Sequence, residues 1–348
     1  MPRLFCLCLL IVCAFPATAS AMEFALQDDN VFVDQHGYSR QRALERAVAL
    51  GATRIRVNVL WSRVLVRGGP RRPVYDFSRI DALQAAAAAR GIRLQLTIAG
   101  PAPKWATADH RVGNVAPDPG KYAAFVRAVV RHFAGRVDRY SIWNEPNWST
   151  WLSPVPRAAS IYRALYRAGY AAVKRVDPTA QVLIGELAPT GEGRAIAPLR
   201  FLRQLTPRGA APLEADGFAL HPYQLTSAPT IAAGGPDDAS IGTLRRLESA
   251  LDALARRHAL ATPSGRPLDL YLTEFGYLTV GHRAQRPAVR AAWLASAIRI
   301  ARRDRRVREL LQYELIDPPA AARWHSALLD RLGHPLSTYG ALARALSG

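Results

Sequence analysis

Residues 138–147 read Asp138-Arg139-Tyr140-Ser141-Ile142-Trp143-Asn144-Glu145-Pro146-Asn147, a short apolar, strand-like run that ends in a glutamate. A second run has the same form and reads Leu268-Asp269-Leu270-Tyr271-Leu272-Thr273-Glu274-Phe275-Gly276. Parallel βα proteins gather their chemistry at the carboxyl ends of their strands, so we expect both glutamates at one face of the molecule. Two carboxyl groups that face each other there are the minimal equipment for cleaving a glycosidic bond.

Strand-like and helix-like segments alternate along the chain. Short runs rich in Val, Ile and Leu predict strands buried on both faces; they are residues 24–26, 53–60, 93–98, 137–144, 181–185, 217–220, 268–273 and 309–315. Segments of helical period lie between them, at 40–50, 77–90, 122–133, 158–176, 241–259 and 287–302. Gly51 and Gly91 each follow such a segment, as is typical of helix ends.

Eight strands that alternate with helices predict an α/β protein, a single (β/α)8 TIM barrel of parallel strands. The length of 348 residues suits one barrel, which needs about 250 residues plus insertions. The alternative is an open doubly wound sheet. It is disfavoured because no Gly-x-Gly-x-x-Gly follows the first strand and no phosphate-binding loop is present.

The first 21 residues differ from the rest of the chain. Arg3 gives a positive start, an apolar run covers residues 4–15, and small residues at 17–21 are typical of a signal peptidase site. We predict a signal peptide at 1–21 and a secreted protein, extracellular or periplasmic, whose barrel domain spans 22–348. Cys6, Cys8 and Cys13 all lie in this leader. The mature chain is therefore expected to lack disulfides and cysteine-based metal sites.

The composition is strongly basic, with 46 Lys and Arg against 27 Asp and Glu and a net charge of +19. One interpretation is attraction to an anionic polymer. The other, which we favour, is arginines on solvated helix faces, because they are spread over several helices and no nucleic-acid motif accompanies them. We expect a monomer with no nucleic-acid partner. No segment after the leader is apolar and long enough to span a membrane.

The spacing of the strands puts the two glutamates opposite each other. Glu145 and Glu274 end the fourth and seventh predicted strands, three places apart in a ring of eight. Their tips therefore face across the barrel mouth, which is compatible with the gap of about 5–5.5 Å between the carboxyl groups of retaining glycosidases. Asn144 can hydrogen-bond a sugar 2-hydroxyl group, and Pro146 ends the strand.

Other polar residues are weaker candidates. Glu186 after the fifth strand and Glu314 on the eighth are rival carboxylates, but neither has an Asn-Glu-Pro or Thr-Glu-Phe-Gly context. The histidines show no metal-ligand spacing, so we predict no metal and no cofactor. Trp148, in the loop after Glu145, either stacks on a sugar ring or packs against the loop. The sequence favours neither interpretation over the other.

These motifs resemble the superfamily of retaining (β/α)8 glycoside hydrolases called clan A, most closely the cellulase-like family 5 and the β-xylosidase- and iduronidase-like family 39. Further matching stretches are Arg56-Val57-Asn58-Val59-Leu60-Trp61, residues 75–81, Pro103-x-Trp105, His221-Pro222-Tyr223 and Tyr313-Glu314-Leu315-Ile316-Asp317. Together they cover most of the chain.

The resemblance implies a role for each matching residue. Glu145 would be the acid/base and Glu274 the nucleophile, with Arg56 beside Glu274 to keep it ionised. Asn144 would bind the 2-hydroxyl group. His221 and Tyr223 would flank the site, with the Tyr223 hydroxyl group directed at Glu274.

One position departs from the family pattern. These families place a tryptophan near the end of strand 8, where this chain reads Leu311-Gln312-Tyr313-Glu314. Tyr313, or Trp324 in the following loop, is expected to substitute for it.

We therefore expect a secreted glycosidase that hydrolyses O-glycosidic bonds, β-linked by resemblance, of a polysaccharide or oligosaccharide with retention of configuration. The alternatives are a barrel that binds glycans without cleaving them and a basic protein that binds polyanions.

Overall fold

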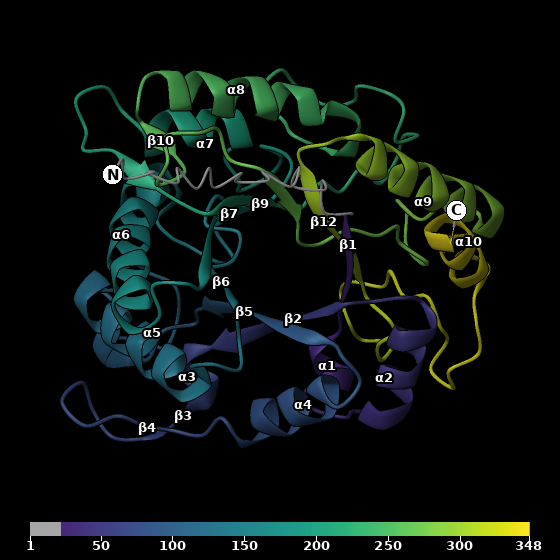
Figure 1. Ribbon diagram of the computed structural model, residues 1–348, viewed down its shortest axis with the longest axis horizontal. Coiled ribbons are helices and arrows are strands. Elements are labelled where there is room, and N and C mark those ends of the chain that lie inside the picture. The colour runs from purple at the N-terminus through teal and green to yellow at the C-terminus, as the bar shows by residue number, and fades with distance from the viewer. Residues whose placement is uncertain (1–21, 348) are drawn as a thin grey trace, which may run out of the picture.

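Eight parallel strands close into a barrel at the centre of the computed structural model, which describes residues 22–347 (Figure 1). The strands are β1 (Glu23–Gln27), β2 (Arg54–Leu60), β5 (Arg93–Ala99), β6 (Arg139–Ile142), β7 (Gln181–Leu187), β9 (Gly217–Leu220), β11 (Leu270–Leu272) and β12 (Val307–Tyr313). They follow one another around the ring in chain order, and β12 pairs with β1 to close it. The predicted (β/α)8 barrel is confirmed, and the open sheet is excluded. The predicted leader, 1–21, lies outside the described residues.

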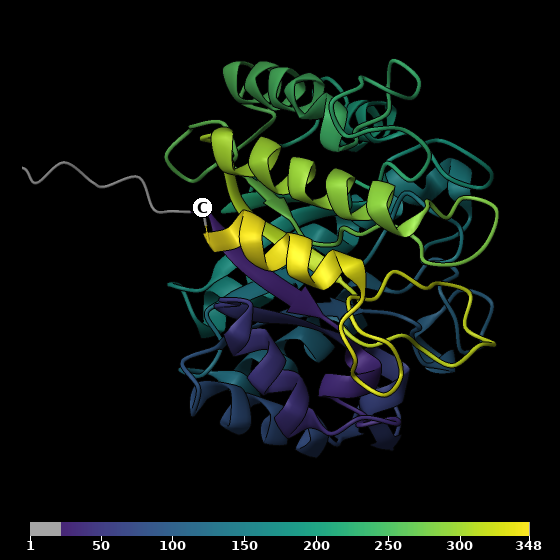
Figure 2. The ribbon, with the colours of Figure 1, turned by 90° about the vertical axis from the view of Figure 1, so that its right-hand side faces the viewer.

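Helices surround the barrel on all sides (Figure 1). They are α2 (Arg40–Ala49), α4 (Ser78–Ala88), α5 (Pro119–Phe133), α6 (Ala158–Val176), α7 (Pro198–Leu205), α8 (Leu244–Arg256), α9 (Pro287–Arg303) and α10 (Ser337–Ser347), and α10 lies along α9 (Figure 2). Gly51 and Gly91 have φ angles of 72° and 71°, so both act as the predicted helix ends. Within residues 22–347, no helix combines the length and the apolar character needed to cross a membrane.

Shorter elements decorate the two ends of the barrel. They are the helices α1 (Asp29–Phe32) and α3 (Trp61–Val64), the 3-10 turns Lys104–Ala106, Val155–Arg157 and Ile241–Thr243, the antiparallel pair β3 (Leu65–Arg67) and β4 (Val74–Tyr75), and the parallel pair β8 (Leu213–Glu214) and β10 (Leu260–Ala261). Most of them come from the loops that follow barrel strands, and those loops carry the chemistry of this fold.

Side chains on opposite faces of the strands differ in polarity. Those that face the surrounding helices are apolar, whereas those that face the interior of the barrel are mostly polar. On β2, Ile55 and Val57 join the hydrophobic core between strands and helices. Arg54 and Arg56 alternate with them and point the other way, because successive side chains of a strand face opposite sides. Both arginines are fully buried, so each needs a buried partner.

Arg54 lies in a charged layer near the amino ends of the strands. The Arg139 guanidinium there donates to Glu309 over 2.5 Å and to Glu23 over 2.7 Å. It also lies 4.5 Å from the centre of the Tyr271 ring. Arg54 Nε contacts the same two carboxylates, at 3.3 Å from Glu23 and 3.9 Å from Glu309. Arg56, one layer up, faces the carboxyl ends of the strands.

Candidate active site

Glu145 and Glu274 meet at the carboxyl end of the barrel, as predicted. Glu145 follows β6 and Glu274 follows β11, and their residues are only 6% and 9% exposed. A carboxylate oxygen of each and a ring nitrogen of His221 all lie within 4.8 Å of one another. Carboxyl oxygens this close fit the separation of about 5–5.5 Å between the carboxyl groups of retaining enzymes better than the about 6.5–9.5 Å of inverting enzymes.

Unusual backbone geometry directs these side chains. Trp143, Glu145 and Glu186 have φ angles of 69°, 37° and 50°, in the left-handed region that non-glycine residues rarely occupy. The Glu145 amide donates to the Glu186 carbonyl over 2.9 Å, and the Trp143 amide donates to Ile98 over 3.0 Å. Such conformations cost about 1–3 kcal/mol each and are found mainly at functional sites, where the surrounding structure enforces them.

Arg56 hydrogen-bonds residues from three of the strand ends that form the site. One guanidinium nitrogen donates to Glu274 over 2.7 Å. The other donates to Asn144 Oδ1 over 2.7 Å and to Glu186 over 3.0 Å. Arg56 therefore lies beside Glu274, where the resemblance placed it. Because Asn144 accepts through its oxygen, its amide nitrogen is left to donate to a ligand.

His221 and Tyr223 lie on the other side of the pair. His221 Nδ1 is 2.9 Å from Glu145 Oε1 and 3.5 Å from Glu274 Oε2, and Nε2 is 2.8 Å from Glu186 Oε2. The Tyr223 hydroxyl group donates to Glu274 Oε2 over 3.1 Å. The predicted contact of Tyr223 with Glu274 is therefore present.

Burial and neighbouring charges divide the carboxyl groups into two kinds. Burial raises the pKa of Glu145, and the charge of Glu274 adds to the rise although the His221 hydrogen bond opposes it. Burial also acts to raise the pKa of Glu186, but Arg56 and His221 outweigh it and lower this pKa to about 2. Burial lowers the pKa of His221, but Glu274, Glu145 and Glu186 raise it to about 9. The site thus favours a protonated Glu145 beside an ionised Glu186.

Two aromatic residues lie near the position of the missing tryptophan. Tyr313 ends β12, and burial, together with Glu314 and Glu274, raises the pKa of its hydroxyl group. Trp324 packs edge-on against Tyr223 with ring centres 4.8 Å apart, and its indole nitrogen donates to Ser326 over 2.9 Å. Trp324 therefore reaches the cluster from the loop after β12.

The remaining tryptophans differ in exposure. Trp148 is 39% exposed in the loop after Glu145, so its ring is accessible to a ligand. Trp61 is fully buried and stacks on Phe125 with ring centres 5.1 Å apart, and Trp143 is also fully buried. Both are therefore packing residues.

Asn147 ties the loops after β6 and β7 together. Its buried amide donates to the carbonyls of Ala188 and Ile196 over 2.9 and 2.8 Å and accepts from the Ala188 amide over 2.9 Å. Both hydrogens of the side-chain amide and one lone pair of its oxygen are therefore used in hydrogen bonds. Because Asn147 is only two residues from Glu145, these hydrogen bonds clamp the loop backbone that carries Glu145.

Glu186 and Glu314, the two other carboxylates that the sequence offered, differ in their contacts. Glu186 is part of the hydrogen-bonded network of Arg56 and His221, through contacts that its sequence context did not indicate. Glu314 is buried, and burial together with Asp28 raises its pKa to about 9, so it is neutral in the ordinary range. Its carboxylate accepts a long hydrogen bond, of 3.5 Å, from the Ser326 amide.

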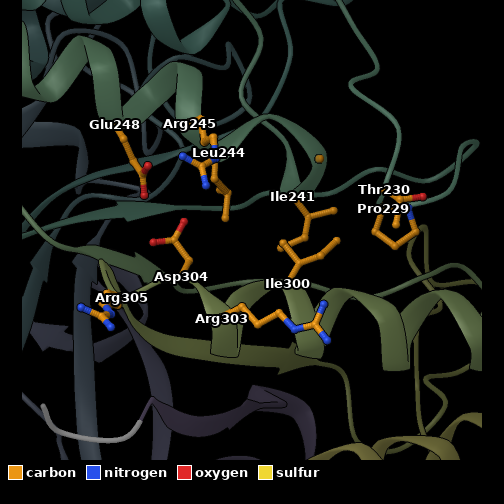
Figure 3. A pocket seen from close by; sticks show the side chains of 11 residues that line it. Pro229, Thr230, Ile241, Leu244, Arg245, Glu248, Ile300, Arg303, Asp304 and Arg305 are labelled. Carbon is orange, nitrogen blue, oxygen red and sulfur yellow. The ribbon is translucent and has the colours of Figure 1, made fainter.

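Glu145, His221 and Glu274 are also the one set in the described part of the chain with ligand atoms close enough to share a cation. The donors Arg56 and Tyr223 already occupy both Glu274 oxygens. A separate cavity of about 650 Å³ lies between α8 and the end of α9 (Figure 3), and none of its lining residues belongs to this network.

No protein-family model matches the sequence, and no curated protein matches it either. Solved structures do match. A family 39 glycoside hydrolase from Bacteroides cellulosilyticus WH2 is 20% identical with a TM-score of 0.71, over 94% of this chain and 64% of that one. A monomeric beta-xylosidase from Caulobacter crescentus CB15 is 20% identical with a TM-score of 0.63, over 92% and 67%.

GH5_18 from Streptomyces cattleya, solved in complex with GlcNAc, is 17% identical with a TM-score of 0.67, over 95% of this chain and 80% of that one. The chain thus spans about two thirds of the length of the first two structures. At these identities the likeness is one of fold: the chain has the (β/α)8 barrel of glycoside hydrolases from families 39 and 5, the two families that its motifs resemble.

Proposed function

We propose that the protein is a retaining glycoside hydrolase that cleaves β-linked O-glycosidic bonds of a polysaccharide or oligosaccharide. One observation carries the proposal: two carboxyl oxygens lie within 4.8 Å of each other at the mouth of the barrel. Burial favours the protonated form of Glu145, whereas Arg56 and Tyr223 donate hydrogen bonds to Glu274. One acidic and one charged carboxyl group at this short distance are what double displacement requires.

The proposed reaction has two steps. In the first, Glu145 protonates the glycosidic oxygen while Glu274 attacks the anomeric carbon, which releases the leaving alcohol and forms a glycosyl ester. In the second, Glu145, now ionised, takes a proton from water, and the water oxygen displaces Glu274 from the anomeric carbon. Two inversions give net retention. The Asn144 amide nitrogen is placed to hold the 2-hydroxyl group.

The surroundings of the reaction are also part of the proposal. Trp324 and Tyr313 form one wall of the sugar site in place of the missing tryptophan, and Trp148 provides a stacking surface farther out. We propose that residues 1–21 are removed on export and that the mature domain acts as a secreted monomer. N-terminal sequencing of protein recovered outside the cytoplasm tests the cleavage point.

Removal of each carboxyl group tests the reaction. We expect Glu274→Ala to lower kcat by several orders of magnitude, since loss of a nucleophile costs about 10⁶-fold in a well-studied hydrolase. Glu145→Ala should lower kcat by about 10²–10⁴-fold, the usual contribution of general acid–base catalysis. Glu192→Ala, at an exposed side chain, is the control. The substrates are a panel of aryl glycosides and oligosaccharides, with products identified by mass spectrometry.

Azide distinguishes the two roles. On an activated aryl glycoside, azide should partly restore turnover of Glu145→Ala and give a glycosyl azide of retained configuration, because a small anion needs no general base. Near-normal turnover in both alanine variants would exclude the proposed roles. Binding of glycans without hydrolysis by the wild-type protein would instead support a glycan-binding barrel.

A further inference from the structure

Glu186 is a buried carboxylate that double displacement does not use. It is the penultimate residue of β7 and has no solvent exposure. One oxygen, Oε2, accepts hydrogen bonds from Arg56 over 3.0 Å and from the Thr273 hydroxyl group over 2.6 Å, and it lies 2.8 Å from His221 Nε2. A guanidinium and a hydroxyl donor on one buried oxygen indicate a charged acceptor, because buried charge needs compensating donors.

His221 lies between Glu186 and the proposed acid. Nε2 faces an ionised carboxylate, so it carries a hydrogen and donates it. Two hydrogen-bond directions are then possible between Nδ1 and Glu145 Oε1, which lie 2.9 Å apart. Nδ1 accepts from a protonated Oε1 when the imidazole is neutral, or it donates to Oε1 when the imidazole is positively charged. Only the second arrangement leaves the Glu145 proton on Oε2.

The charges of the cluster favour the second arrangement. Two cations, Arg56 and a doubly protonated His221, balance the carboxylates of Glu186 and Glu274. Glu145 is then the neutral member, which suits its burial. Its Oε2 has no hydrogen-bond partner among residues 22–347, and its side chain keeps 8% exposure, so this oxygen is available to a ligand.

We propose that Glu186 is a positioning residue that holds the His221 imidazole in its doubly protonated form, so that the acidic proton of Glu145 stays on Oε2, toward the leaving group. The inference rests on the proposed function, since it takes Glu145 as the acid. Without the charge of Glu186, the imidazole loses a proton more easily, and Glu145 directs its own proton to Nδ1 instead of to the substrate.

Other charged and titratable groups surround this pair from several elements. They are Asp29 of α1, Arg56 of β2, Tyr162 of α6, Tyr223 after β9, Glu274 after β11, and Glu309 and Tyr313 of β12. All of these remain in a Glu186→Gln variant. That substitution keeps the shape of the side chain and one acceptor oxygen, so it removes the charge with little change of packing.

The protonation of His221 is measured first, in the wild-type protein without substrate. Imidazole ¹⁵N chemical shifts, assigned with His221→Asn, should show both ring nitrogens protonated at pH 7. In Glu186→Gln the pKa of His221 should fall by about one unit or more, as expected when a nearby opposite charge is lost. A wild-type His221 with one bare ring nitrogen at pH 7 would overturn the inference.

Kinetics provide the second test. In a plot of kcat/KM against pH, the fall at high pH (the basic limb) reports loss of a proton from the Glu145–His221 pair, which titrates as one unit. Removal of a negative charge lowers the pKa of that pair whichever residue loses the proton. In Glu186→Gln, the limb should therefore move about one unit or more to lower pH. At the optimum, kcat should fall about tenfold to a hundredfold with little change in KM, since Glu145 keeps its proton but directs it to His221 Nδ1 instead of to the leaving group.

Glu186→Asp separates charge from shape. It keeps the charge and shortens the side chain, so its basic limb should match that of the wild type even if kcat is lower. The reverse pattern, an unmoved limb in Glu186→Gln and a damaged Glu186→Asp, would show a purely packing role and refute the inference. If the wild type hydrolyses no glycoside in the panel, the proposed function fails, and the imidazole shifts alone still decide how Glu186 acts on His221.

Discussion

Tyr223 and Tyr277 both bury a phenolic hydroxyl group, but the two hydroxyl groups differ in hydrogen bonding. Both side chains are almost fully buried. Tyr223 donates to Glu274 over 3.1 Å, whereas the Tyr277 hydroxyl group has no hydrogen-bond partner among the described residues. Each packs against the Phe275 ring, with ring centres 6.4 and 5.3 Å away. The two tyrosines therefore form a matched pair for measuring one hydrogen bond.

Tyr223→Phe should lower kcat/KM about tenfold to a hundredfold, because a hydrogen bond to a charged group contributes about 1.5–3 kcal/mol. Tyr277→Phe should leave kcat/KM unchanged and should not lower Tm, because it removes an unpaired buried hydroxyl group. Steady-state kinetics and thermal unfolding of both variants provide the comparison. Equal losses in the two variants would mean that the Tyr223 hydroxyl group has no special role.

Most of the site residues could be predicted because they follow strands at recognisable motifs. Glu145, Glu274, Arg56, Asn144, His221 and Tyr223 all belong to one hydrogen-bonded network, as the sequence indicated. The part played by Glu186 could not be predicted, because it depends on how far β7 extends toward the mouth. A Gly-Glu pair at the end of a buried strand was the only signal in the sequence.

At the scale of elements, α8 and α9 face each other across the cavity shown in Figure 3. The carboxyl groups of Glu248 and Asp304 point toward each other there, with Arg245, Arg303 and Arg305 along the walls. Burial raises the pKa of Glu248 to about 7, and its hydrogen bond to Asp304 adds to the rise. One proton shared between Glu248 and Asp304 would therefore remove the repulsion between these two carboxyl groups.

Glu248→Gln should make the fold more stable than the wild type at pH 8 but not at pH 4.5. The folded protein binds this proton more tightly than the unfolded chain, whose glutamates have a pKa near 4.3. The stabilisation is thus present below about pH 4.5 and is lost as the pH rises through about 7. Thermal unfolding from pH 4.5 to 8 measures the difference in Tm.

Glu192→Gln makes the same change of charge at an exposed side chain and is the control. A difference in Tm between Glu248→Gln and the wild type that stays constant with pH would contradict the shared proton.

Periodicity predicted the long helices well and the short elements poorly. The amphipathic segment 158–176 is α6 to the residue. By contrast, α7, α10 and the pairs β3–β4 and β8–β10 were not predicted. A strand of two or three residues has too little alternation to detect, and α7 has only eight residues, about two turns. Their positions follow from contacts with the finished barrel rather than from local pattern.

At the scale of the whole molecule, the interior of the barrel contains a layer of buried ion pairs in addition to the apolar core. The layer of Arg54, Arg139, Glu23 and Glu309 joins the first, second, fourth and eighth strands across the barrel. Arg54 and Glu309 are fully buried. Such a layer is costly to break at one point, because the partner charge is left without compensation.

Glu309→Ala should lower the free energy of unfolding by about 3–5 kcal/mol, the usual cost of breaking a buried ion pair from one side. Asp237→Ala, which breaks an exposed pair with Arg203, should cost no more than about 1 kcal/mol. Urea unfolding monitored by circular dichroism measures both. A small loss in Glu309→Ala would mean that water or rearranged arginines replace the carboxylate.

The clamp at Asn147 has a consequence for how the protein can be made. Asn147-Trp148-Ser149 is an acceptor sequence for N-linked glycosylation, yet its amide is completely buried and hydrogen-bonded. A eukaryotic secretory host attaches its glycan to this kind of sequence while the chain is still unfolded. A glycan there would hold the loops after β6 and β7 apart beside Glu145, so a host without this modification is the suitable choice for production.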